Sequence, residues 1–161
     1  MSASAAADDQ AAPAMSERRF ADWTLRCEST TCWIYHNAPR DEGPRAPYAM
    51  TIGARAEGGS YRLLVHIAKA PRLMRRKGIE LYVDGQKAGS LAFARCGDPD
   101  CIFLADYAPA AIDTIVAAQS LVLWTPDSQR LQGDATEVST LGLKEAFGAF
   151  RASALPGVLP R

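Results

Sequence analysis

Residues 78–107 read GIELYVDGQKAGSLAFARCGDPDCIFLADY, and turn chemistry, strand alternation and cysteine spacing in this segment all indicate the same structure. Apolar and polar residues alternate over 79–83, which is typical of a strand with one buried face. An Asp-Gly dipeptide at 84–85 predicts a two-residue turn, because both residues tolerate positive φ. A return strand over 90–95 leads into a turn bounded by two cysteines, and an apolar run follows at 102–104. We therefore predict three strands joined by a hairpin and a cysteine-bounded turn.

The rest of the chain continues this pattern of short strands and turns. Strands are predicted where aromatic and β-branched residues gather between Gly, Pro and Asp clusters, and helices where apolar residues recur at helical spacing. The predicted strands are 20–27, 32–36, 48–54, 60–68, 79–83, 90–95, 102–104, 121–124 and 131–138, and the predicted helices are 109–119 and 143–150. In the second helix, Leu143, Phe147 and Phe150 form an apolar stripe that should pack on the sheet. The sequence predicts a mainly β, single-domain antiparallel β-sandwich with two short helices.

At 161 residues the chain is long enough for one domain with a sizeable core and too short for two ordinary ones. Residues 1–17 carry almost no large apolar side chain, so a flexible Ala-rich tail is expected there. The sandwich domain is predicted over 18–152, and a C-terminal tail over 153–161. The three tryptophans all fall in predicted strands and are expected in the core: Trp23, Trp33 and Trp124.

Four cysteines form two sets of identical spacing, Cys27 with Cys32 and Cys96 with Cys101, with four residues between the partners of each set. Local disulfides are the favoured interpretation; each would close a loop of about six residues, contribute roughly 2 kcal/mol and require an oxidising compartment. The alternative is one zinc site that uses all four thiolates, since zinc knuckles allow this spacing. We favour disulfides because the first set runs straight into apolar Trp33, where a knuckle commonly carries Gly or Lys. Reduced core cysteines are the least favoured interpretation.

The charge balance and the start of the chain bear on partners and compartment. Eighteen Lys and Arg balance eighteen Asp and Glu, so no net field attracts nucleic acid. No apolar run is long enough to cross a bilayer. Ala3-Ser4-Ala5 and the acidic residues after it resemble a small-residue cleavage site, but no apolar leader core precedes them. We expect a leader upstream of this numbering, and hence a periplasmic, secreted or outer-envelope location.

Residues with catalytic or metal-binding chemistry are few and scattered. His36 and His66 lie in predicted strands without Cys, Asp or Glu at ligand or triad spacing, so both are interpreted as polar strand residues. The sequence contains no nucleophile elbow, phosphate-binding Gly loop or zincin motif. Asp98 and Asp100 offer carboxylates to calcium, but both are ordinary turn residues, and a plain turn is favoured. We predict no enzyme activity, no cofactor, no metal site and no small-molecule substrate.

A basic cluster, Arg72, Arg75, Arg76 and Lys77, precedes the predicted strand at 79–83. Functionally, it is a candidate contact for an anionic membrane surface or a protein partner in the cell envelope. A solvated loop is the favoured interpretation, because no Trp or Tyr lies among the four charges.

Several of these features together resemble the invasion-associated locus B family of bacterial envelope proteins. They are the Asp-Trp-x3-Cys opening at 22–27, the Asp-Gly hairpin, the Arg-Cys-x4-Cys centre at 95–101 and the closing Leu-Gly-Leu-x3-Phe helix at 141–147. The resemblance covers about residues 20–151. It implies an exported β-sandwich with two local disulfides, no known catalytic residues and, in some members, a role in the invasion of host cells. The missing leader and the basic cluster depart from the family's usual pattern.

The leading hypothesis is a non-enzymatic, exported envelope or periplasmic protein that acts through macromolecular contacts, in host invasion or in the envelope itself. The alternative is an accessory subunit bound to a bacterial membrane protein complex, with the N-terminal tail and the basic cluster as contacts. Co-purification separates the two hypotheses, because an accessory subunit leaves a detergent extract together with its complex.

Overall fold

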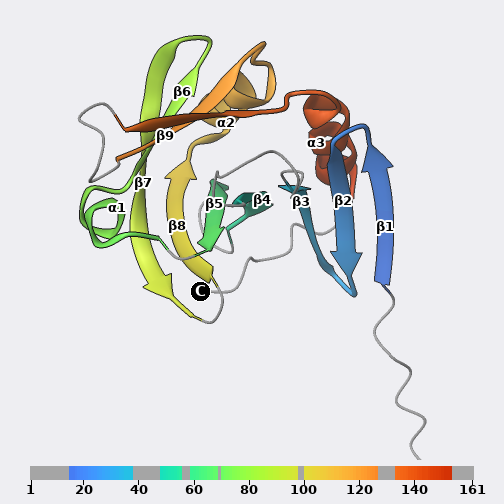
Figure 1. Ribbon diagram of the computed structural model, residues 1–161. Helices are drawn as coiled ribbons and strands as arrows, with labels where there is room; N and C mark the ends of the chain where they lie inside the picture. Colours follow the sequence, from blue (N-terminus) through green and yellow to red (C-terminus); the bar gives the residue numbers. More distant parts are fainter. Residues whose placement is uncertain are drawn as a thin grey trace, which may run out of the picture.

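The computed structural model describes residues 15–37, 48–55, 59–68, 70–97, 100–126 and 133–153. Within these ranges the chain forms ten strands in one antiparallel sheet, and three helices (Figure 1). The strands are β1 (Met15–Phe20), β2 (Trp23–Glu28), β3 (Thr31–Asn37), β4 (Tyr48–Ala54), β5 (Tyr61–Ala68), β6 (Ile79–Val83), β7 (Gln86–Cys96), β8 (Asp100–Tyr107), β9 (Leu121–Thr125) and β10 (Asp134–Val138). The helices are α1 (Arg72–Lys77), α2 (Pro109–Val116) and α3 (Leu143–Ala152). Neighbouring strands follow the order β1-β2-β3-β4-β5-β8-β7-β6-β9-β10.

Strand β7 divides the sheet into two layers, because it pairs with a different neighbour at each end. Its first part, up to Leu91, pairs with β6, whereas residues 92–96 pair with β8. One layer therefore contains β1 to β5 and β8. The other contains β6, β9 and β10, which cross over the first layer in Figure 1. The predicted mainly β, antiparallel sandwich is confirmed.

Two long-range hydrogen bonds hold the layers together near the end of β10. The indole Nε1–H of Trp23 donates to the backbone oxygen of Ser139 at 2.8 Å, across 116 residues of sequence. The hydroxyl of Tyr48 donates to the backbone oxygen of Glu137 at 3.1 Å, across 89 residues. The first residues of β2 and β4 are thereby attached to the chain that leads from β10 into α3.

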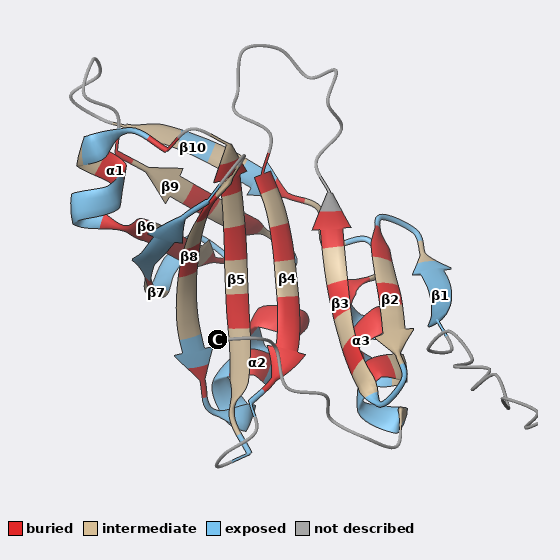
Figure 2. Cartoon of the chain, turned by 90° about the horizontal axis from the view of Figure 1, so that it is seen from below, coloured by how far each residue is buried: buried red, intermediate tan, exposed pale blue. Residues whose placement is uncertain are grey.

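The core lies between the two layers and receives alternate residues of each strand. Figure 2 shows buried and half-buried residues alternating along β5, as expected where one face of a strand is packed. Helix α3 buries Leu143, Phe147 and Phe150, which confirms the predicted apolar stripe. The aromatic ring of Tyr61, in β5, packs edge-on against Phe147 with ring centroids 5.2 Å apart, so α3 covers the inner face of the first layer.

The Asp-Gly turn between β6 and β7 forms as predicted, with φ of 49° at Asp84 and 80° at Gly85. The Asp84 carboxylate also accepts hydrogen bonds from the backbone N–H groups of Gln119 and Ser120, both at 2.9 Å. The turn is therefore tied to the loop before β9. Strand β7 begins at Gln86, directly after the turn, rather than at the predicted residue 90. The prediction was late because the intervening Gln-Lys-Ala-Gly sequence contains no large apolar residue.

Two elements were not predicted. Strand β1 moves the start of the domain from the predicted residue 18 to Met15, because residues 15–20 pair with β2 along their whole length. The sequence of β1, MSERRF, has no apolar alternation, and its residues are exposed apart from half-buried Phe20. The second element is α1, since the basic cluster forms a helix instead of the predicted loop. Residues 1–14, 131–132 and 154–161, which hold parts of the predicted tails and of one predicted strand, lie outside the described residues.

The prediction that all three tryptophans are core residues is correct only for Trp23, which is fully buried. Trp33 and Trp124 are half-buried. Trp33 lies out of phase with the buried Cys32 and Ile34, and therefore on the outer face of β3, where the Arg26 guanidinium lies 5.9 Å from its ring centroid. Strand position alone does not distinguish the two faces of a strand, and a large ring can be accommodated on either face.

Candidate functional site

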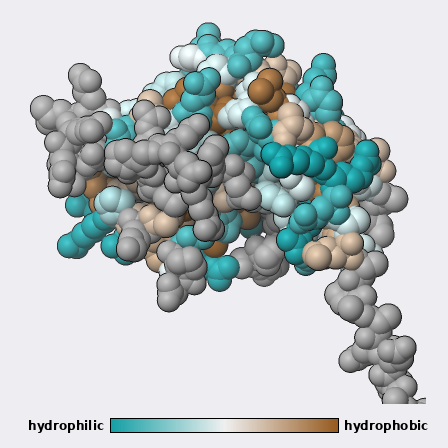
Figure 3. Space-filling model, turned by 45° about the vertical axis from the view of Figure 1, so that its right-hand side comes forward, coloured by the Kyte–Doolittle hydropathy of each residue, from teal (hydrophilic) through white to brown (hydrophobic). Residues whose placement is uncertain are grey.

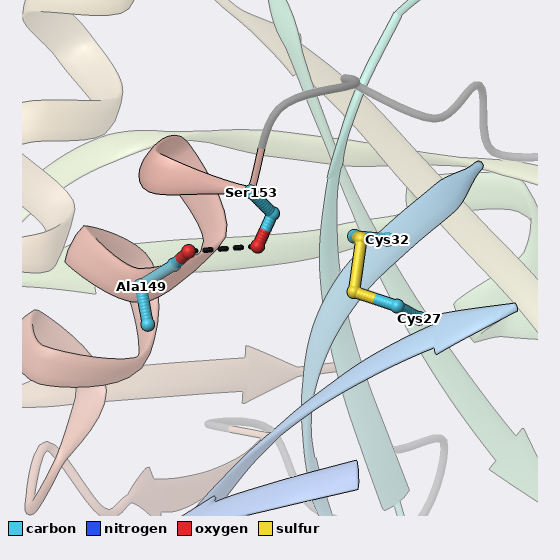
Figure 4. Close-up of a disulfide and its surroundings, with 4 residues drawn as sticks. All are labelled: Cys27, Cys32, Ala149 and Ser153. Atoms are coloured by element: carbon cyan, nitrogen blue, oxygen red, sulfur yellow. Dashed lines mark hydrogen bonds between the residues drawn. A yellow bond between two sulfur atoms is a disulfide. The ribbon is translucent and has the colours of Figure 1, made fainter. Parts of the chain in front are cut away.

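The four cysteines form two disulfides, Cys27–Cys32 and Cys96–Cys101, as predicted. Each joins residues directly opposite each other on paired strands, with Cα atoms 4.1 Å and 3.9 Å apart. These are the closely spaced, non-hydrogen-bonded positions of an antiparallel ladder. Figure 4 shows the first disulfide beside the C-terminal turn of α3, where the Ser153 hydroxyl donates to the backbone oxygen of Ala149 at 2.8 Å.

The two disulfides lie at opposite ends of the first layer, which removes the zinc alternative. Cys101 pairs in register with Ile67, which in turn pairs with Tyr48 at the start of β4. Cys32 adjoins Trp33, which pairs with Gly53 near the end of β4. The four sulfur atoms therefore do not meet at one site, and each disulfide closes a separate hairpin.

Helix α1, which we call the basic helix, presents the whole basic cluster on the surface. Arg72, Arg75, Arg76 and Lys77 are all exposed, while Met74 is buried and anchors the helix, which packs on β7. Three of the four cations lie in the last turn, where the partial negative charge of the helix carbonyls favours cations.

Gly78 fixes the position of the basic helix relative to β7. Its φ of 78° ends the helix, and its N–H donates to the backbone oxygen of Met74 at 2.8 Å. A side chain at this position would place its Cβ 2.5 Å from the backbone oxygen of Leu91. Only glycine allows this approach, so the cations of the basic helix are held close to the middle of β7.

None of the four cationic side chains of the basic helix forms an ion pair or hydrogen bond with another described residue. Several cations elsewhere on the described surface are paired. They are Arg26 with Glu17 and Glu28, Arg55 and Arg62 with Asp106, Lys87 with Glu80, and Arg151 with Asp113. The basic helix is therefore a local concentration of positive charge that no described acidic residue pairs, in a chain whose net charge is zero.

A buried histidine, His36, lies where the two layers are joined. Its side chain is only 4% exposed and lies between the rings of Trp23 and Tyr48, at centroid distances of 5.4 Å and 6.1 Å. Its Nδ1 has no hydrogen-bond partner among the described residues. Burial lowers the pKa of His36, and the carboxylate of Asp22 opposes this only in part. The sequence indicated a polar strand residue; the signal for burial was its phase, two residues after buried Ile34.

This burial predicts that acid destabilises the protein through His36. The unfolded chain binds a proton near pH 6.5, whereas folded His36 resists protonation, so the free energy of unfolding falls as the pH is lowered through about 6.5 to the folded pKa. Each unit of pKa depression corresponds to about 1.4 kcal/mol. Urea unfolding between about pH 7.5 and 4.5 measures this slope. His36→Phe should flatten it.

His66→Gln is the matched control for this measurement, because His66 is a half-buried histidine on the outer face. Burial lowers the pKa of His66 too. The nearby carboxylate of Asp100 opposes this effect, and the positive charge of Arg95 adds to it. Its removal should change the slope less than removal of His36. Equal slopes in the wild-type and His36→Phe proteins would show that His36 titrates normally in the folded state.

The other candidate sites of the sequence receive no support from the geometry. The described part of the chain holds no group of three or more His, Cys, Asp or Glu residues that could bind a metal ion. Asp98, one of the two calcium candidates, lies outside the described residues, and Asp100 lies at the start of β8. No described helix is long and apolar enough to cross a membrane.

Comparison with known proteins agrees with the fold. The sequence matches the family model described as "Invasion associated locus B (IalB) protein" over residues 23–151. The solved structure of invasion associated protein B from Bartonella henselae has a similar fold, with a TM-score of 0.65 and 17% sequence identity, over 85% of this chain and 96% of that chain. No curated protein sequence matches this chain. Since the family match spans most of the sequence, from the start of β2 to the last turn of α3, the chain belongs to the invasion associated locus B family.

Proposed function

We propose that this protein is a non-enzymatic, exported protein of the bacterial cell envelope that acts by binding another macromolecule through the basic helix. The observation that carries the proposal is the set of four exposed cationic side chains that have no ion-pair or hydrogen-bond partner among the described residues. A cation that is already paired must break its ion pair before it binds a new partner. The four side chains of the basic helix have no such ion pair with a described residue to break. The two disulfides are consistent with an oxidising compartment outside the cytoplasm.

The chemistry of the basic helix fits an acidic protein surface better than a lipid bilayer. Its apolar residues are not available for insertion, because Met74 is buried and Leu73 is half-buried against the domain. Amphipathic helices that bind bilayers insert an exposed apolar face below the headgroups. The basic helix offers charge alone, which gives orientation and fast association with a surface of opposite sign. An acidic partner protein in the envelope is therefore the proposed ligand.

Changing Arg72, Arg75, Arg76 and Lys77 together to Gln should leave the fold intact and weaken partner binding. Exposed, unpaired charges add little to stability, so the melting temperature should stay nearly unchanged. Association with an acidic partner in envelope extracts should fall by at least about tenfold at low salt, where screening is least. Pull-downs at low and high salt, with vesicles of anionic lipid in parallel, measure both partner classes.

A second variant with the same loss of charge separates local from global electrostatics. Arg18, Arg19, Lys87 and Lys144 are also exposed and lie outside the basic helix. Their joint replacement by Gln should retain binding. If both quadruple variants bind equally well, or lose binding equally, the basic helix is not the contact site. Binding to vesicles but not to envelope protein would replace the acidic protein by a membrane surface.

The alternative role, an accessory subunit of a membrane protein complex, uses the same basic helix and differs in the permanence of the contact. A subunit would co-fractionate with its complex in detergent at physiological salt. A transient envelope protein would instead be recovered as a free species of its own size.

A further inference from the structure

The sheet has two edge strands, β1 and β10, and they differ in how far their outer edges are covered. At the end of β10, the backbone oxygen of Glu137 accepts the Tyr48 hydroxyl, and the oxygen of Ser139 accepts the Trp23 indole N–H. Along β1, no described residue forms a hydrogen bond with the outer edge, and the strand is exposed up to Phe20. An open edge strand is a template on which a further strand can pair.

The register of the β1–β2 hairpin shows which backbone groups of β1 are available. Phe20 pairs with Trp23 across a two-residue turn, so these two residues exchange backbone hydrogen bonds. Alternate residues back along β1 do the same, and the residues between them point their N–H and C=O groups away from β2. The residues that point away are Met15, Glu17 and Arg19. An incoming strand would therefore form its hydrogen bonds with these three residues.

We propose that a second copy of this chain occupies this edge, with its β1 antiparallel to the first β1 about a two-fold axis at Arg18. In this register Glu17 of each copy lies directly opposite Arg19 of the other, on the same face of the joined sheet. Opposite charges at such positions stabilise a strand pair, whereas like charges destabilise it. A two-fold axis at Glu17 would place two carboxylates opposite each other. The sequence of β1 is thus complementary to itself in one register.

The like charges that meet at the two-fold axis are already drawn apart by an intramolecular contact. The Arg18 guanidinium lies 5.2 Å from the centroid of the Phe20 ring of its own strand. Because the paired strands run in opposite directions, the two guanidinium groups are pulled away from the axis to opposite sides. Cation–π attraction of this kind persists at exposed sites.

The contact is polar and small, which sets its strength. Hydrophilic side chains predominate on the side of the molecule that bears β1 in Figure 3. A strand of six residues buries less surface than the roughly 1,200 Å² at which stable interfaces begin. The dimer should therefore form and dissociate with protein concentration, and it should weaken as salt screens the two charge pairs.

A cysteine introduced at the two-fold axis tests the register directly. All four native cysteines are in disulfides and none is free, so a new thiol has no competitor. Arg18→Cys would place two thiols opposite each other at a Cα separation of about 4.5 Å, within reach of a disulfide. Ser16→Cys, on the same face, would place them four residues apart, roughly 13 Å. On mild oxidation of the full chain, Arg18→Cys should form the linked dimer at least about tenfold faster; equal rates would overturn the register.

Charge reversal tests whether the pairing exists at equilibrium in solution. Sedimentation velocity over a wide concentration range should show the wild-type chain dimerising. Glu17→Arg or Arg19→Glu alone should weaken the dimer by about tenfold, and the double change should restore it, because the charges are then exchanged between the strands. Glu17 also pairs with Arg26, so circular dichroism must show that each variant is folded. A wild-type chain that stays monomeric, or a dimer indifferent to all three variants, would overturn the proposal.

Discussion

Replacement of Trp23 by Ala is expected to lower the free energy of unfolding by about 3–5 kcal/mol. The Trp23 side chain is fully buried and lies against His36, with ring centroids 5.4 Å apart. Truncation would leave a cavity between the layers. It would also remove the indole N–H that donates to the backbone oxygen of half-buried Ser139, and the loss of this hydrogen bond adds its own cost.

Trp33→Ala is the matched control, since it removes the same atoms from the same hairpin on its outer face. Trp33 is half-buried and contacts the guanidinium of Arg26, so its loss should cost less than about 2 kcal/mol. Urea unfolding of both variants, with unchanged dependence on denaturant, measures the difference. If the two variants lost equal stability, Trp23 would not be the residue that joins the layers.

Gly142→Ala should be nearly as damaging, with an expected loss of more than about 3 kcal/mol. Gly142 has a φ of 82° at the start of α3, a conformation that costs any residue with a Cβ about 1–2 kcal/mol. A Cβ at this position would also overlap the backbone oxygen and carbon of Phe20. Because both clashing groups are backbone, β1 and α3 would have to separate. The expected result is a lower melting temperature together with faster hydrogen exchange in β1.

Gly85→Ala isolates the conformational part of this loss. Gly85 has a similar φ of 80°, but nothing lies within 4 Å of the Cβ that the substitution would add. Its loss should stay near the 1–2 kcal/mol of the left-handed backbone alone. A Gly142→Ala protein no less stable than the Gly85→Ala protein would mean that α3 can move away from Phe20 without cost.

The basic helix could be predicted from the sequence only in part. The four cations stand together in the sequence, so their proximity could be predicted from the sequence alone. Their helical conformation was missed, because six residues are too few to display a period, and the segment has only one buried residue, Met74. That these side chains have no acidic partner among the described residues could not be predicted at all, since it depends on which strands lie beside the basic helix.

Residues that are close together in the sequence determined the hairpins, the two disulfides and the apolar stripe of α3. The Asp84–Gly85 turn and the two cysteine pairs depend on turn geometry and on the pairing of adjacent strands, which a few neighbouring residues specify by themselves. The hydrophobic residues of α3 mark one face of a helix whatever that face contacts.

Only the tertiary structure decided which faces are buried and which segments join the layers. Strand β1 has no core face of its own and is ordered by pairing with β2, while Trp23 and Trp33 differ because Trp23 faces the core and Trp33 lies half-buried on the outer face of β3. The hydrogen bond from Trp23 to Ser139 joins residues 116 positions apart in the sequence. Gly142 cannot carry a side chain because the backbone of Phe20 occupies that space. Such contacts form when distant segments share one core, and the alternation of a single strand contains no information about what its partner will be.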